Sequence, residues 1–210
     1  MKEHVELFKN GNEILIIYQD ETNESPRSWD NLGTMVCFHN GYNLGDKHEY
    51  NHHDYSGWDD MKNDIIKKEN VEIILPIYLY DHSGIRINTT GFSCTWDSGQ
   101  IGWIFISKEK VRDEYRCKRI SSKLRDRVKQ FLISEVDIYD QFLIGDVYGF
   151  RLFSILEKEV QEYMKKHNIE KIEDIPEKKL INLGEEIDSC WGFYGDNWKE
   201  NGLFDYANWK

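Results

Sequence analysis

This chain of 210 residues lacks any long hydrophobic run. Its most apolar stretch, residues 73–80, is far shorter than the roughly 18 residues that a membrane-spanning helix requires. Residues 1–6 are mostly charged and offer no apolar leader, so we expect no secretion signal. These two absences predict a cytoplasmic protein without a membrane partner.

The cysteines also lack a recognisable framework. Cys37, Cys94, Cys117 and Cys190 lie far apart and form no C-x-x-C pair. This spacing argues against a compact zinc knuckle and against a disulfide scaffold. We therefore expect four reduced thiols.

Charge of one sign is in excess. Acidic residues outnumber basic ones by 38 to 27, and the formal net charge is −11. Residues 1–75 and 134–210 each carry about −8, whereas residues 76–133 carry about +5. Overall acidity repels nucleic acid, so direct nucleic-acid binding is not expected. The basic island from Lys108 to Lys129 is interpreted as a counterpart to the acidic flanks or a solvated helix face, the alternative being a phosphate contact.

Hydrophobic periodicity predicts several strands and one long helix. Short β-branched or aromatic runs predict strands at residues 13–18, 34–39, 71–80, 85–94, 101–106, 146–153 and 190–195. Apolar residues at three- and four-residue steps predict a long helix over 121–143 and a short one over 58–68. Strands cluster ahead of the long helix. The expected fold class is therefore α+β, with a mainly antiparallel sheet, one long amphipathic helix and shorter helices.

No shift in composition separates two cores, so residues 1–210 are expected to form a single domain. The segment 157–180 is heavily charged and is predicted to be an exposed excursion. Residues 198–209 gather four large apolar groups at the end of the chain. This tail is expected to dock on the domain, the alternative being an oligomer or partner interface.

Two polar turns supply candidate catalytic residues. If the strand register brings the turns together, His82 could act as a base on Cys94 or Ser98, with Asp97 or Asp81 orienting the imidazole, which is the arrangement that nucleophilic catalysis requires. Trp96 and Gln100 flank this turn and are candidate binding residues. Asp, Ser and Gly are also ordinary turn formers that cap the backbone, so a structural role is the competing interpretation.

A histidine-rich stretch supplies a candidate metal site. Imidazole and carboxylate ligands together suit zinc, manganese or iron. The candidate ligands are His39, Asp46, His48, Asp81 and His82, of which Asp46 and His48 are also candidate binding residues. Their spacing matches no established zinc motif, so a solvated loop is the competing interpretation. No cofactor is expected other than such a divalent metal.

Six segments together resemble a family of uncharacterised bacteriophage and mobile-element proteins. They are NLGTMVCFH (31–39), YNLGD (42–46), YDHSG (80–84), FSCTWDSGQ (92–100), GDVYGF (145–150) and DSCWGFYG (188–195). The resemblance implies a host-cell context and an anti-defence role of the anti-restriction or anti-CRISPR type. It carries over no catalytic residue.

These observations favour an accessory protein that binds and inhibits or modulates a host defence or nucleic-acid-processing complex. An acidic chain suits a partner protein or ribonucleoprotein with a basic surface, because complementary potentials speed encounter. The alternative is a metal-dependent or cysteine-based hydrolase or nuclease with a His/Asp/Cys site. The sequence leaves the choice between binder and enzyme open, as it does self-association into a homo-oligomer.

Overall fold

The computed structural model describes residues 4–22, 24–82 and 84–209. The chain divides into two compact units, of which unit 1 combines residues 1–23 with 145–210 and unit 2 spans residues 24–144. Each unit has its own apolar clusters, where the sequence predicted one common core. Among the described helices, none combines the length and apolar character needed to cross a bilayer.

Unit 1 is built on a four-stranded antiparallel sheet. Its strands, in spatial order, are β1 (His4–Asn10), β2 (Glu13–Gln19), β7 (Val147–Ile155) and β8 (Gly184–Tyr194). Gly11 takes a positive φ of 58° in the tight turn between β1 and β2, a conformation that glycine adopts without strain. The sequence did not predict β1, because its alternating polar residues resemble a surface loop.

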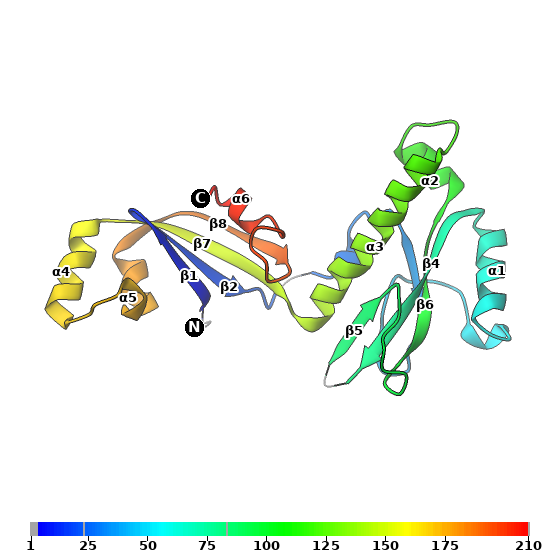
Figure 1. The fold of residues 1–210 in the computed structure, drawn as a ribbon, viewed down its shortest axis with the longest axis horizontal. Helices are drawn as coiled ribbons and strands as arrows, with labels where there is room; N and C mark the ends of the chain where they lie inside the picture. Colours follow the sequence, from blue (N-terminus) through cyan, green and yellow to red (C-terminus); the bar gives the residue numbers. More distant parts are fainter. Residues whose placement is uncertain (1–3, 23, 83, 210) are drawn as a thin grey trace. The chain divides into compact units, whose positions relative to one another are not determined.

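Both faces of this sheet are covered. On β2, Ile14 and Ile16 face one apolar cluster, whereas Leu15 and Ile17 face another. The first cluster is covered by α4 (Glu157–His167), the 3₁₀ turn Ile172–Asp174 and α5 (Glu177–Asn182). Figure 1 shows α5 on one side of the sheet and α6 (Leu203–Tyr206) on the other.

The expected exposed excursion at 157–180 is therefore wrong in part. Val160, Ile175 and Leu180 are buried against the sheet. Charged side chains dominate the outer surface of this segment, and they concealed the sparse apolar residues that hold it in place. The segment closes one half of the unit 1 core.

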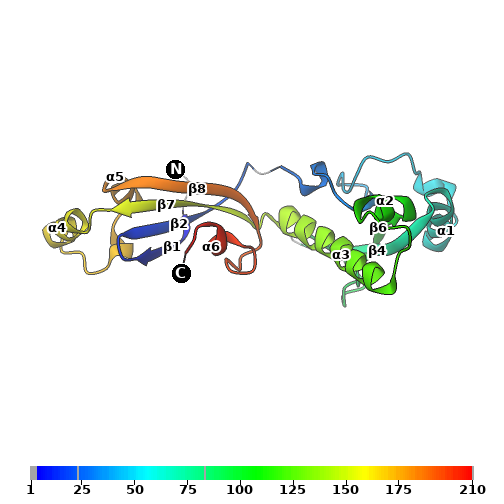
Figure 2. The ribbon, with the colours of Figure 1, turned by 90° about the horizontal axis from the view of Figure 1, so that it is seen from above.

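The C-terminal tail docks on the opposite face, as predicted. Phe204 meets Phe8 edge to face at 5.2 Å between ring centroids, and the Trp198 indole N–H donates to Glu6 at 2.5 Å. Figure 2 shows α6 lying over the strands of this sheet. Aromatic burial of this kind ties down an end of the chain that would otherwise fray.

Unit 2 holds a second four-stranded antiparallel sheet. Its spatial order is β3 (Thr34–Cys37), β6 (Ser98–Ser107), β4 (Val71–Asp81) and β5 (Ile85–Asn88). The strands predicted at 71–80 and 85–94 pair as a hairpin, although β5 ends at Asn88. The expected α+β class with a mainly antiparallel sheet is confirmed.

Helices cover this sheet from both sides (Figure 1). The long helix α3 (Ser122–Ile144) buries Val128, Leu132 and Val136 against one face, which confirms the predicted amphipathic helix. On the other face, α1 (Trp58–Lys68) packs Met61 and Ile65 against aromatic residues of β6. A short helix, α2 (Lys108–Glu114), follows β6 directly.

The register places the candidate residues at one end of the unit 2 sheet. Strands β3 and β4 are both antiparallel to β6, so they end at the end where β6 begins. The segments after β3 and β4 and the loop before β6 therefore emerge together, at the lower end of this unit in Figure 1. The start of α2 lies at the opposite end of the sheet, where β6 finishes.

Candidate functional site

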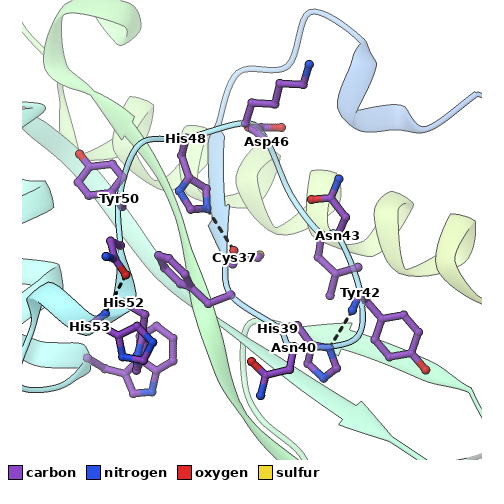
Figure 3. Close-up of a pocket in the computed structure, with 15 residues that line it drawn as sticks. Cys37, His39, Asn40, Tyr42, Asn43, Asp46, His48, Tyr50, His52 and His53 are labelled. Carbon is purple, nitrogen blue, oxygen red and sulfur yellow. Dashed lines mark hydrogen bonds between the residues drawn. The ribbon is translucent and has the colours of Figure 1, made fainter.

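The loop between β3 and α1 encloses an open pocket of about 1040 Å³ (Figure 3). The pocket is lined by Cys37, Phe38, His39, Asn40, Tyr42, Asn43, Leu44, Asp46, Lys47, His48, Tyr50, Asn51, His52, His53 and Trp58. Its rings pack on one another: the His52 ring meets Trp58 at 5.1 Å, and Phe38 meets His48 at 4.9 Å. The pocket wall is thus a self-packed aromatic layer.

Two pocket histidines are engaged by backbone groups. His39 Nδ1 accepts hydrogen bonds from the N–H groups of Gly41 and Tyr42 at 3.1 and 3.2 Å. His48 Nε2 lies 3.1 Å from the carbonyl oxygen of Cys37, and because that oxygen only accepts, Nε2 must carry the proton. Figure 3 shows His48 directed at Cys37, with His39 at the opposite side of the loop. Both imidazoles therefore shape the loop.

Asp46 belongs to a buried ion network beneath the pocket. Its two carboxylate oxygens accept from Arg27 at 2.9 and 2.6 Å, and one also accepts from the Met35 N–H at 2.7 Å. Arg27 also donates to Glu135 of α3 at 3.2 Å, and its side chain is only 4% exposed. Burial lowers the pKa of Arg27, but the bonds to the two carboxylates outweigh it and hold that pKa above its usual value.

Glu135 completes the network by binding backbone groups. One carboxylate oxygen accepts from the N–H of Leu32 at 2.6 Å, and both accept from the N–H of Gly33. The network thereby fastens the segment before β3 and the pocket loop to α3. In this structure Asp46 is a structural anchor, and both of its carboxylate oxygens are engaged by Arg27.

The predicted metal site is not assembled. Asp46 faces Arg27, and His39 and His48 each bond to backbone at separate points of the loop. Asp81 is the last residue of β4 and His82 follows it, in a different loop. Among the described residues, no three His, Cys, Asp or Glu side chains are grouped as metal ligands would be. The five residues are not grouped because they lie on two different loops and because His39, Asp46 and His48 are hydrogen-bonded within their own loop or to Arg27 and Cys37.

The residues of the second predicted site, His82, Cys94 and Asp97, do lie together, but Asp97 rather than His82 is the central residue. His82 Nδ1 lies 3.6 Å from an Asp97 carboxylate oxygen, and the Cys94 thiol lies 3.6 Å from the same oxygen. Within the described residues, no hydrogen bond joins His82 to Cys94. Nucleophilic catalysis needs the imidazole beside the thiol. Here the carboxylate stands between them, so the three side chains form a bridged turn.

Backbone bonds hold this turn. The Ser98 hydroxyl donates to the carbonyl oxygen of Cys94, and the Asp81 N–H donates to the carbonyl oxygen of Asp97 at 2.8 Å. Asn88 braces the start of the same loop by accepting from the Gly91 N–H at 2.7 Å. The loop that contains Trp96 is therefore preorganised.

Trp96 is the feature that this turn presents to solvent. Its side chain is 94% exposed, far more than any other large apolar residue among those described. Tyr80 lies between the rings of His82 and Phe92, at 6.1 and 5.6 Å, and forms an aromatic floor near the turn. The other candidate here, Gln100, bonds the carbonyl oxygen of Gly102 at 3.2 Å and braces β6.

The thiol of Cys37 offers a test of this geometry. Burial raises the pKa of Cys37 to about 12, because the thiolate would lose its hydration. We expect iodoacetamide at neutral pH to modify Cys94, which is partly exposed, while Cys37 stays unmodified until the protein is unfolded. Peptide mass spectrometry over time measures both. Equal labelling rates in the folded protein would contradict this burial.

Sequence reasoning missed Arg27 and Glu135, the two charges that anchor the site. They are far apart in the chain, and neither belongs to a motif. A buried arginine is recognised only once the fold brings carboxylates to it.

Comparison of this chain with family models, with curated proteins and with solved structures found no match in any of the three.

Proposed function

We propose that this chain is a binding protein that docks on its partner through the Trp96 loop. As an accessory protein of a phage or mobile element, it inhibits or modulates a host defence or nucleic-acid-processing complex. The single observation that supports this proposal most is a tryptophan, 94% exposed, on a braced loop.

Leaving an indole in water forgoes a large apolar burial, roughly 2 kcal/mol or more for a side chain of this size. Tryptophan is among the residues most enriched in the energetic centres of protein interfaces. A partner that buries Trp96 also meets little ordering cost, because the loop is already held by Ser98 and Asn88.

Charge suggests the kind of partner. Asp81 and Asp97 flank the loop, and the chain as a whole carries −11. A basic rim around an apolar pocket on the partner would complement both features. Such surfaces line the nucleic-acid channels of nucleases and related complexes.

The enzyme alternative makes a different demand. A hydrolase built on His82, Cys94 and Asp97 needs the imidazole to take the proton of the thiol. The bridged order of the turn supports binding over this chemistry.

Trp96→Ala tests the proposal. In a host whose defence system restricts phage, the wild-type protein is expected to restore plaque formation. The Trp96→Ala variant is expected to bind its partner about 30-fold more weakly and to lose most of this plaque rescue. Leu156→Ala is the control, because Leu156 is also exposed, at 64%, but lies in unit 1. Rescue by Trp96→Ala equal to wild type would contradict a role for this loop.

A further inference from the structure

The end of unit 2 opposite the Trp96 loop is strongly cationic. Residues 108–129, which form α2, the following loop and the first eight residues of α3, contain ten basic and four acidic side chains. The rest of the chain is acidic, since the total is −11. This segment is therefore a local reversal of charge within an acidic protein.

Most of these cations are exposed and unpaired. Six members, Arg112, Arg116, Lys118, Arg119, Lys123 and Lys129, are exposed and form no ion pair with the described residues. Within the described part of the chain, Arg125 is the one cation of this segment that forms a salt bridge, with Glu72. The acidic flanks therefore supply one ion pair to this segment among the described residues, whereas one interpretation of the sequence made them its general counterpart.

The charge order of α3 also opposes its own dipole. The first turn holds no acidic residue and the last turn no basic one, while Lys123, Arg125 and Arg127 lie near the positive N-terminal end. A cation in the first turn of a helix is unfavourable, and Lys123 forms no ion pair with the described residues that would offset this cost. A local rule broken in this way is expected at a surface kept for function.

We propose that this surface, formed by Arg112, Arg116, Lys118, Arg119 and Lys123, binds the phosphate backbone of duplex DNA. Unpaired cations that neutralise phosphates release counterions, which is the main driving force of such binding. The opposing acidity of the chain is no obstacle at short range, because charges beyond about 10 Å are screened at 0.1 M salt.

Duplex rather than single-stranded nucleic acid is favoured by the aromatic side chains. Single-strand binders stack bases on free aromatic rings. Tyr115 lies within this segment and Phe131 follows it on α3, and the guanidinium of Arg127 lies over both rings, at 5.7 and 5.6 Å from their centroids. Both rings are thus covered by Arg127 and are not free to stack on bases. Binding of a duplex through its phosphate backbone requires only the positive charges of this surface.

The proposal extends beyond the partner role of the Trp96 loop and is tested on purified protein with DNA alone. Anisotropy of a short fluorescent duplex is measured between about 50 and 200 mM salt. The triple variant Lys118→Glu, Arg119→Glu, Lys123→Glu is expected to bind at least tenfold more weakly, and each lost phosphate contact lowers the salt slope by about 0.9. Lys123→Glu places a carboxylate in the first turn of α3, where it suits the helix dipole, so this change is expected to leave the helix intact.

The matched control is Lys158→Glu, Lys165→Glu, Lys166→Glu, which makes the same change in net charge on α4 of unit 1. It should bind DNA within about twofold of wild type, as should Trp96→Ala. The proposal would be overturned if both triple variants weakened DNA binding equally, or if the wild-type protein did not bind the duplex at low salt. It would also be overturned if the wild-type protein bound a single strand more tightly than the duplex, or bound polyglutamate as tightly. The outcome of the plaque assay with Trp96→Ala does not affect this test, because DNA binding is measured on purified protein.

Discussion

Arg27→Ala is expected to lower the free energy of unfolding of unit 2 by roughly 3–5 kcal/mol. The variant leaves Asp46 and Glu135, which are 22% and 15% exposed, without their shared cation. It also removes the donor that binds the carbonyl oxygen of Gly33 at 2.8 Å. Removing one partner from a buried charge network costs more than the network contributes, because the remaining charges stay desolvated.

Urea denaturation followed by tryptophan fluorescence measures this loss, with separate fits if the two units unfold in separate steps. Lys68→Ala is the control in the same unit, since its ion pair with Asp64 lies at the surface and contributes at most about 1 kcal/mol. Similar losses for the two variants would show that the Arg27 network is not a structural anchor.

Gly102→Ala is the second substitution with a large expected effect, at least about 2 kcal/mol of destabilisation. A Cβ at this position would lie 2.0 Å from the carbonyl oxygen of Val36 and 2.9 Å from the Cα of Cys37. Both atoms are backbone, so relief requires β3 to move away from β6. The pocket loop follows β3 and would move with it.

Gly99→Ala provides a matched control in the same strand. A Cβ there would meet nothing within 4 Å, and alanine restricts the unfolded chain more than glycine does. We expect its midpoint of thermal unfolding to equal or exceed that of wild type, while Gly102→Ala unfolds several degrees lower. A Gly102→Ala protein as stable as Gly99→Ala would contradict the close approach of β3 and β6.

The elements that could be predicted are those whose signal is local. The apolar steps along α3 and the β-branched run of β2 each record which face is buried, so a short window of sequence suffices. The division into two units could not be predicted in this way. It arises because β2 pairs with β7, far along the chain, and no linker composition marks the crossing points.

The candidate site shows the same limit more sharply. The sequence left open whether the turns that carry His82, Cys94 and Asp97 meet, and the pairing of the end of β4 with the start of β6 is what brings them together. Which side chain stands in the middle depends on rotamers that spacing does not record. Likewise, Asp46 carries the residue type of a metal ligand, and only the fold shows that it faces Arg27.

In the sequence, unit 2 lies between the two segments of unit 1, and this order determines which unit can fold first during synthesis. Unit 2 is continuous from residue 24 to 144, so all of its strands have left the ribosome while β7 and β8 are still untranslated. Until then β2, with buried Leu15 and Ile17, has only β1 as a partner. We infer that the nascent chain completes unit 2 first and carries an aggregation-prone hairpin of β1 and β2 until β7 arrives.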